Sequence, residues 1–413
     1  MRQFCTKCGK SPGDEFQTFC ECGGFTEMEY DLKQVKLHDS PNPYVRFADL
    51  LPVKELHHRL PQDSRYTPTV HAKQLGKLLG MPSLYLKDET VLPTRSTKDR
   101  MAFVSLAYLC EHGVRSFCIS STGNSSTAYT NAIRSHPAMR VFVFTAESFI
   151  RRVQHAEHGQ LRHFGLHDAS FVAAFEAAAA YAKANGHTSE TGFFNLGRRE
   201  GLKIAFLEAA EQIPQPIDWY VQAVSSAMGV YGTYKGAKEL FGLRRIDRLP
   251  KLMCVQQENC SPMVRAFNES SETIQPHHIV PKPRGIAEAI LRGNPTRVYP
   301  YIRQIVIESG GMCVAVSEDE IREARRVVEE LEGLSPCFSA STAMAGLIKQ
   351  VRSKSFPAKD TVMVNLTGGE RTGEPAPKKI TWMQRGPNGW VEESTPNHHP
   401  QTVRSQVSRM ILA

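Results

Sequence analysis

The sequence predicts an α/β protein with mostly parallel sheets in two domains, and three observations lead to this fold class. From about residue 70 onward, short β-branched apolar runs alternate with longer helical patterns, as in chains built from βα units. The chain has 413 residues, of which 41% are hydrophobic, so it is long enough for two buried cores. Charged residues make up 22% of the chain, an ordinary share for a globular protein.

The elements follow one another in a regular order. Residues 1–30 form a small module with four of the ten cysteines, and four prolines interrupt residues 31–65. The expected strands cover residues 83–87, 116–120, 140–145, 219–224, 251–256, 312–316 and 361–366. The expected helices cover residues 98–110, 126–134, 169–184, 231–241, 318–331 and 340–352. No clear core pattern continues from about residue 385, which predicts a surface tail.

The net charge and the hydrophobic pattern of the chain indicate which kinds of partner to expect. The net charge is +8 and the basic residues are scattered, which favours small anionic substrates over nucleic acid. No apolar run approaches the roughly 20 residues that cross a bilayer, so we expect no membrane partner. The N-terminus lacks the apolar segment of a secretory signal, and the dispersed cysteines look like reduced core thiols. We therefore expect a cytoplasmic protein.

The N-terminal module offers a metal site. Its cysteines are two closely spaced pairs of thiols, Cys5 and Cys8, then Cys20 and Cys22. Four thiolates on tight turns are the ligands of a structural zinc ion, and so small a module needs such a cross-link to fold. The second pair is separated by one residue instead of two, so a module whose cysteines bind nothing is the alternative.

The richest chemical signal is a lysine followed by a hydroxyl-rich turn. Residues 94–100 read Thr-Arg-Ser-Thr-Lys-Asp-Arg, and residues 120–125 read Ser-Ser-Thr-Gly-Asn-Ser. Lys98 lies at the start of an expected helix, with Arg95 and Arg100 close by in sequence. Burial and neighbouring cations lower the pKa of a lysine and make its amine nucleophilic. Taken alone, such a lysine is more often an ordinary surface residue, and such a turn is more often a plain serine-rich loop.

Together and in this order, the two segments resemble the threonine synthase-like family of fold-type II pyridoxal-phosphate (PLP) enzymes, which includes threonine synthase and cysteate synthase. The family pattern Asn-Pro-Thr-Gly-Ser-Phe-Lys-Asp-Arg corresponds to Leu-Pro-Thr-Arg-Ser-Thr-Lys-Asp-Arg at residues 92–100. The resemblance covers most of residues 1–380. It implies a Schiff base on Lys98 and a tryptophan synthase β-like fold with two open parallel-sheet domains, next to a zinc-ribbon-like module.

The resemblance also implies roles for the other motif residues. In the family, the asparagine matching Asn124 contacts the 3′-oxygen of the cofactor, and the hydroxyl matching Thr367 faces its pyridine nitrogen. The cofactor phosphate is expected on a turn that is glycine-rich in the family and here reads Ser225, Ser226, Ala227, Met228 and Gly229. The substrate carboxylate is expected on Ser121, Thr122, Gly123, Asn124 and Ser125.

Arg95 replaces a glycine of the family pattern. We assign it to an anionic group of the substrate, either phosphate or sulfonate. A solvated loop arginine is equally consistent with the sequence.

The implied activity is β- or γ-replacement on a phosphorylated amino acid, such as O-phosphohomoserine or O-phosphoserine, with release of phosphate. Lys98 would also act as the base at the α-carbon. The altered residues Arg95 and Thr97 indicate a divergent carbon–oxygen lyase or synthase of amino-acid biosynthesis. A serine/threonine dehydratase-type β-elimination and a degenerate non-catalytic homologue remain alternatives.

The family implies a homodimer and a division of the chain into domains. We expect a large PLP-binding domain at 31–98 and 196–384, a small α/β domain at 99–195 and a tail at 385–413.

Overall fold

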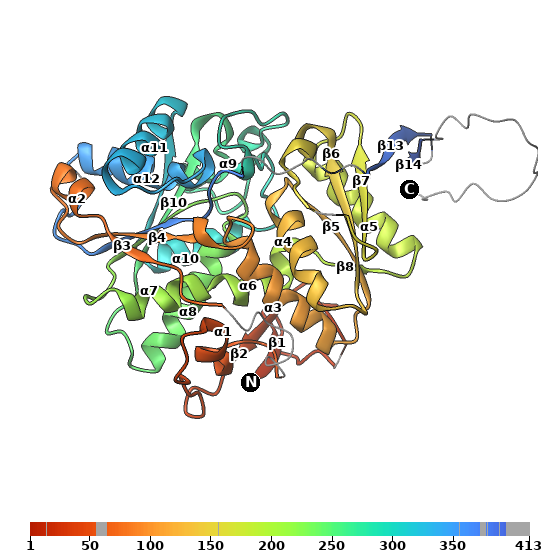
Figure 1. The fold of residues 1–413 in the computed structure, drawn as a ribbon, viewed down its shortest axis with the longest axis horizontal. Helices are drawn as coiled ribbons and strands as arrows, with labels where there is room; N and C mark the ends of the chain where they lie inside the picture. The colour runs from red at the N-terminus through yellow and green to blue at the C-terminus, as the bar shows by residue number, and fades with distance from the viewer. Residues whose placement is uncertain are drawn as a thin grey trace, which may run out of the picture. The chain divides into compact units, whose positions relative to one another are not determined.

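The computed structural model describes residues 1–13, 15–54, 64–155, 157–354, 356–371, 377, 379–387 and 389–393. The chain divides into two compact units (Figure 1). Unit 1 comprises Met1–Gly113 and Phe193–Gly373, and unit 2 comprises Val114–Gly192 and Glu374–Ala413. In its described part, each unit contains a six-stranded sheet of mostly parallel strands. The predicted α/β fold class is therefore confirmed.

The sheet of unit 1 has the strand order β11-β10-β9-β12-β4-β3. Its parallel strands are β4 (Leu84–Asp88), β9 (Trp219–Ala223), β10 (Lys251–Gln257), β11 (Met312–Val316) and β12 (Val362–Leu366). The edge strand β3 (Thr69–His71) pairs antiparallel with β4. Because β4, β12 and β9 are parallel neighbours, the loops that follow these three strands meet at one edge of the sheet.

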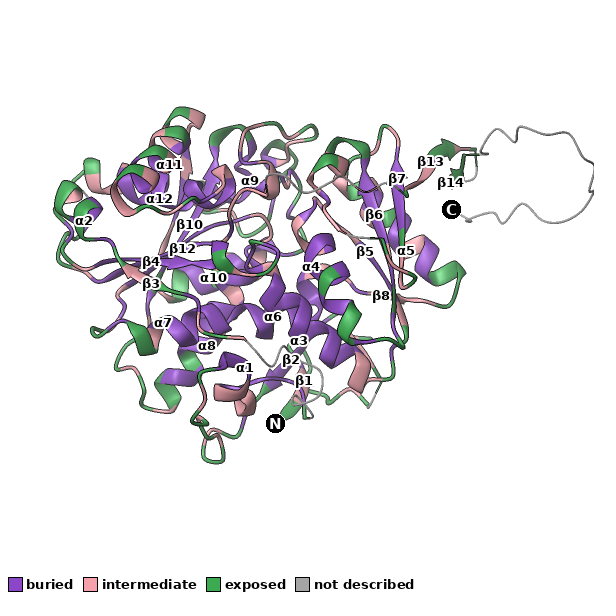
Figure 2. Ribbon diagram, viewed as in Figure 1, coloured by how far each residue is buried: buried purple, intermediate pink, exposed green. Residues whose placement is uncertain are grey.

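Helices cover both faces of this sheet (Figure 1). On one face lie α11 (Glu318–Glu332) and α12 (Phe338–Arg352), and on the other lie α7 (Ile204–Gln212), α8 (Met228–Gly242) and α10 (Tyr299–Glu308). The remaining helices of unit 1 are α1 (Pro43–Arg46), α2 (Lys73–Leu79), α3 (Lys98–Glu111), α6 (Leu196–Leu202) and α9 (Pro262–Asn268). Aliphatic residues of the central strands and of α12 share one apolar core, and the strands are almost wholly buried (Figure 2).

The sheet of unit 2 has the strand order β14-β13-β7-β6-β5-β8. Its parallel strands are β5 (Ser116–Ser120), β6 (Arg140–Ala146), β7 (Leu161–Leu166), β8 (Thr188–Ser189) and β13 (Thr381–Gly386), and β14 (Gly389–Glu392) pairs antiparallel with β13. The helices α4 (Asn124–Ala132) and α5 (Phe171–Ala184) follow β5 and β7. Phe144 and Phe164 form the aromatic centre of its core.

The division into units differs from the expected domain boundaries at two places. The sequence assigned helix α3 to the small domain, but the helix lies in unit 1. The reason is its close packing on α6, where a Cβ on Gly197 of α6 would lie only 2.7 Å from the Cα of Ser105 in α3. After β12 the chain returns to unit 2, where Met383 of β13 is fully buried. Strand β14 lies inside the expected tail, and residues 394–413 of that tail are outside the described residues.

The N-terminal module is a two-stranded antiparallel sheet of β1 (Arg2–Cys5) and β2 (Thr26–Glu29). It belongs to unit 1, where Tyr30, just after β2, donates a hydrogen bond to Glu200 of α6. No described helix is long and apolar enough to span a membrane.

Candidate active site

Lys98 is the first residue of α3 and follows β4 after the turn Glu89–Val91 and the loop 92–97. Asp99 fixes this loop to the helix. The N–H of Thr94 donates to Asp99 Oδ2 at 2.7 Å, and Thr94 Oγ1 donates to Asp99 Oδ1 at 2.7 Å. The Asp99 side chain is fully buried, so these two hydrogen bonds join the start of the helix to the loop without competition from solvent.

The loop before Lys98 pairs with the segment that leaves β12. The N–H of Thr97 donates to the carbonyl of Thr367 at 2.9 Å, and Gly369 donates to the carbonyl of Arg95 at 2.9 Å. Ser96 and Gly368 form an antiparallel bridge between these hydrogen bonds. Thr367 is thereby held beside the residue that precedes Lys98.

The environment of Lys98 favours its neutral amine. Burial, and then the nearby positive charge of Arg198, lower the pKa of Lys98 to about 8. Arg198 lies in α6 and is 5% exposed. Sequence reasoning did not identify Arg198; the available signal was a run of three charged residues, 198–200, all of which become buried.

A buried ion-pair network lies next to this site. Arg100 Nε donates to Glu89 Oε2 and Arg100 Nη1 donates to Glu208 Oε1, both at 2.7 Å. Lys87 Nζ donates to Glu208 Oε2 at 2.7 Å. All four side chains are at most 1% exposed. The network joins β4, α3 and α7, and so fixes the start of α3 relative to the sheet.

A helix N-terminus follows β9 at the same edge. Ser225 and Ser226 are half-buried, Ala227 has a left-handed backbone with φ 54°, and α8 begins at Met228. A Cβ on Gly229 would lie 2.8 Å from the amide group of Gln222, so only glycine allows the first helical turn to approach the strand this closely. Free N–H groups at the start of a 15-residue helix and two serine hydroxyls suit an anion such as a phosphate.

The hydroxyl-rich turn lies in unit 2, between β5 and α4. The Ser121 hydroxyl accepts hydrogen bonds from the N–H groups of Gly123 at 3.0 Å and Ser126 at 3.1 Å. Gly123 has φ 120°, and a Cβ there would lie 2.7 Å from the Arg152 carbonyl oxygen. Thr122, Asn124 and Ser125 are half-buried. The Ser121 oxygen is thus used by the backbone of the turn, and Asn124 begins α4.

Comparison with known proteins decides the family. Residues 60–368 match the model of the pyridoxal-phosphate dependent enzyme family. The chain belongs to this family. It is 29% identical to a threonine synthase of Methanocaldococcus jannaschii, over 91% of this chain and 93% of the relative. It is 25% identical to a cysteate synthase of Methanospirillum hungatei, over 95% of this chain and 94% of the relative.

Solved structures of the same fold agree with this assignment. A maize serine racemase superposes with a TM-score of 0.63 at 16% identity, covering 77% of this chain and 92% of that one. A threonine deaminase of Solanum lycopersicum superposes with a TM-score of 0.61 at 15% identity, covering 75% of this chain and 80% of that one. Both likenesses show the fold, and the predicted fold-type II PLP-enzyme architecture is confirmed.

The unit 1 residues fit the PLP cofactor of this family. An aldehyde reacts with a neutral amine, and a pKa of about 8 gives Lys98 a larger neutral fraction than an ordinary lysine has. A phosphate monoester fits the start of α8 with Ser225 and Ser226. Thr367 offers a hydroxyl at the third loop of the same edge.

The four N-terminal cysteines are brought together as a cluster. Their sulfur atoms lie within 4.8 Å of one another, with Cys5 and Cys22 3.4 Å apart and Cys8 and Cys20 3.7 Å apart. Tetrahedral zinc with Zn–S bonds of about 2.3 Å needs sulfur atoms about 3.8 Å apart. The cluster therefore has the geometry of a structural zinc site, as the sequence predicted.

A second group of potential metal ligands comprises Glu269, His277 and His278. His278 Nδ1 accepts the N–H of Gln275 at 2.9 Å, so the neutral ring carries its proton on Nε2 and donates it to Glu269 Oε2 at 2.8 Å. A metal ligand would need the Nε2 lone pair, with a proton on Nδ1. This group is therefore a hydrogen-bonded cluster, with no ring nitrogen of His278 left for a metal.

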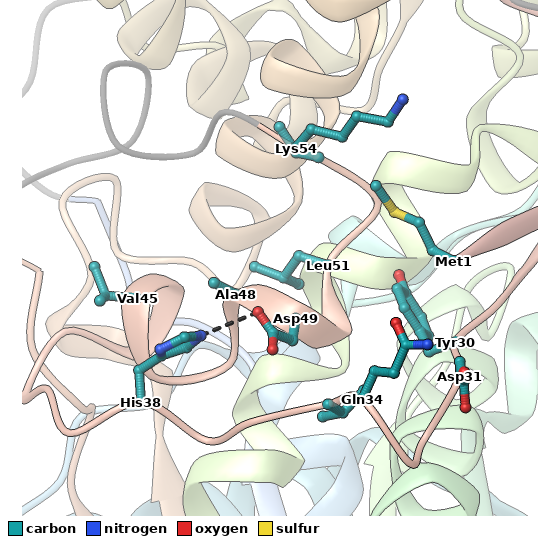
Figure 3. Close-up of a pocket in the computed structure, with 12 residues that line it drawn as sticks. Met1, Tyr30, Asp31, Gln34, His38, Val45, Ala48, Asp49, Leu51 and Lys54 are labelled. Atoms are coloured by element: carbon teal, nitrogen blue, oxygen red, sulfur yellow. Dashed lines mark hydrogen bonds and ion pairs between the residues drawn. The ribbon is translucent and has the colours of Figure 1, made fainter.

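A separate cavity of about 450 Å³ lies between β2 and the α1 region (Figure 3). His38 Nε2 and Asp49 Oδ1 are 3.0 Å apart on one side of it, and Tyr30, Asp31 and Gln34 lie on the other. None of its lining residues comes from the loops that follow β4, β9 or β12. It is not part of the candidate active site.

Proposed function

We propose that the protein catalyses β- or γ-replacement on a phosphorylated amino acid, with Lys98 as the catalytic lysine. The C–O bond to phosphate breaks and phosphate leaves, and an incoming nucleophile such as water or sulfite forms the new bond to the amino-acid side chain. The observation that carries this proposal is the lowered pKa of Lys98 at a sheet edge shared with Thr367 and the start of α8. Relatives named threonine synthase and cysteate synthase, each aligned over more than nine-tenths of both chains, support the same reaction class.

The bound cofactor would supply an electron-accepting ring that stabilises negative charge at the α-carbon of the substrate. Lys98, when its amine is free, would take the proton from this carbon and return it later. The Thr367 hydroxyl would leave the ring nitrogen unprotonated, which favours elimination and replacement over transamination. Ser225, Ser226, Ala227, Met228 and Gly229 would bind the cofactor phosphate.

We assign the turn of unit 2 to the remaining contacts. Asn124 would contact the 3′-oxygen of the cofactor. Backbone N–H groups and hydroxyls would bind the substrate carboxylate, with contributions from Ser121, Thr122, Gly123, Asn124 and Ser125.

The test is reconstitution of the purified protein with PLP. We expect an absorbance band of bound cofactor that is absent from Lys98→Ala, and release of inorganic phosphate from O-phospho-L-serine or O-phospho-L-homoserine. Release of ammonia and a 2-oxo acid from L-serine or L-threonine, without use of the phosphorylated amino acids, would instead establish the dehydratase. Absence of a cofactor band in the wild-type protein would establish a degenerate homologue.

The control for Lys98→Ala is Lys251→Ala, which replaces an exposed lysine and should keep the cofactor band. Lys203→Ala is an unsuitable control, because Lys203 is buried in ion pairs.

A further inference from the structure

Arg95 has a backbone conformation that its side chain disfavours. Its φ is 54°, in the left-handed region where glycine is unstrained and other residues are not. The loop enforces this conformation, because the Arg95 N–H donates to Leu92 O at 2.7 Å and its carbonyl accepts from Gly369 at 2.9 Å. These two hydrogen bonds hold the Arg95 backbone in place despite the strain.

The guanidinium group of Arg95 lies directly on the backbone of the β12 exit. A Cβ built on Gly369 would lie 2.8 Å from Arg95 Nη2 and 3.1 Å from Arg95 Nε. The side chain is therefore folded over Gly369, two residues after Thr367. It belongs to the same pair of loops that holds Lys98 and Thr367 together.

The charge of Arg95 has no carboxylate partner among the described residues, unlike the charges of Arg100 and Arg325. Arg100 pairs with Glu89 and Glu208, and Arg325 pairs with Glu370, the residue after Gly369. Arg95 is exposed, and its guanidinium carries five N–H donors in a planar arrangement. A planar guanidinium group can donate two parallel hydrogen bonds to two oxygens of one phosphate.

We propose that Arg95 binds the phosphate group of the amino-acid substrate and selects phosphorylated over unphosphorylated amino acids. The assignment rests on the proposed function and deepens it. Lys98 acts on any amino acid of the reaction class, whereas Arg95 contacts the leaving group. The loop holds the exposed guanidinium beside Gly369, two residues after Thr367.

The chain offers a matched control. Arg244 has φ 55°, is exposed and has no ion-pair partner among the described residues; it follows α8 and lies outside the loops of the site. Arg95→Gly and Arg244→Gly thus remove the same charge and relieve the same strain at two places. Both should melt close to the wild-type temperature, because relief of left-handed strain offsets the larger unfolded-state entropy of glycine.

Binding is measured from the change in the cofactor absorbance as O-phospho-L-serine or L-serine is added. Arg95→Gly should weaken binding of O-phospho-L-serine by roughly 10- to 100-fold, the range of a charge-assisted hydrogen-bonded pair. Binding of L-serine should change less than about twofold. Arg244→Gly should leave both affinities unchanged.

Gly369→Ala provides a second variant that keeps the arginine. Its Cβ would displace the guanidinium from the β12 exit, so it should reduce the preference for the phosphorylated amino acid without removing any charge. Arg95→Lys should recover only part of the affinity, because an ammonium cannot make the two parallel hydrogen bonds.

Two outcomes overturn the assignment of Arg95 while the proposed function stands. One is a wild-type protein that releases phosphate but binds both amino acids equally. The other is an Arg95→Gly protein whose preference equals that of Arg244→Gly. Failure of the proposed function looks different, since cofactor binding or phosphate release would then be absent from wild type and every variant alike.

Discussion

At the residue scale, the reactivity of Lys98 depends on a neighbour that is distant in sequence. Burial is the larger cause of its lowered pKa and the charge of Arg198 is the second. At pH 7, one unit below a pKa of about 8, about a tenth of the Lys98 amines are neutral, far more than for a lysine at its ordinary pKa of 10.5. The rate at which the apoprotein takes up PLP should therefore rise with pH and level off above about 8.

Arg198→Gln should shift this profile to higher pH. Loss of the nearby positive charge raises the pKa of Lys98, so its amine stays protonated to a higher pH. The measurement is the rate of appearance of the cofactor band after PLP is added to apoprotein at a series of pH values. Arg244→Gln, which removes an exposed charge elsewhere, should keep the wild-type profile. Identical profiles for Arg198→Gln and wild type would show that Arg198 does not influence the lysine.

At the scale of elements, the Arg100–Glu89–Glu208–Lys87 network holds α3 against β4 and α7. Glu208→Gln should lower the free energy of unfolding by about 3–5 kcal/mol, because it leaves the buried charge of Lys87 without its carboxylate partner and Arg100 with Glu89 alone. The exposed pair of Arg326 and Glu330 is the comparison, and Glu330→Gln should cost less than about 1 kcal/mol. Denaturant unfolding measures both, and equal losses would contradict this account.

The elements that sequence reasoning predicted are those with strong local patterns. The central strands of unit 1 are continuous apolar runs, and α11 begins with a capping box of Ser317 and Glu320. Strand β7 escaped prediction because it contains His163 and Gly165. His163 bonds to Thr145 inside the sheet, and a Cβ on Gly165 would lie 2.7 Å from Trp382 of β13.

Helix α6 escaped prediction for a related reason. Glycine disfavours helix, yet α6 contains Gly197 and Gly201, each in close contact with α3. A Cβ on Gly201 would lie 2.5 Å from the Arg100 carbonyl oxygen. Both glycines are needed for the close packing of α6 on α3, which a local sequence pattern does not reveal. The same packing determines the position of Arg198, which lies between them.

At the scale of the whole molecule, the candidate site is only partly readable from the sequence. Lys98, Thr367 and the residues before α8 follow strands, so the parallel topology of the sheet predicts their meeting. Arg198 comes from a helix far along the chain, and its effect on Lys98 depends on how α6 packs against α3. The left-handed conformation of Arg95 likewise depends on pairing with a segment more than 270 residues away.

The cysteine module is joined to the same helix that carries Arg198. Arg199 Nη1 donates to the carbonyl of Phe193 at 2.7 Å, Arg199 also donates to the carbonyl of Thr26 in β2, and its guanidinium lies 4.8 Å from the centre of the Phe25 ring. Tyr30 OH donates to Glu200 of α6 at 2.7 Å. The cysteine cluster, whose Cys5 pairs with Thr26 of β2, therefore supports the packing of α6 against the rest of unit 1.

Loss of the metal should consequently destabilise unit 1 as well as the module. We expect one zinc ion per wild-type chain, measured by elemental analysis. Cys8→Ser removes one of the four thiols, so this variant should lose the zinc and its melting temperature should fall. Cys110→Ser is the matched control, since Cys110 is a half-buried thiol of α3 outside the cluster. It should keep both the zinc and the melting temperature. A wild-type protein without bound metal, with Cys8→Ser as stable as Cys110→Ser, would mean that β1 and β2 hold together by packing alone.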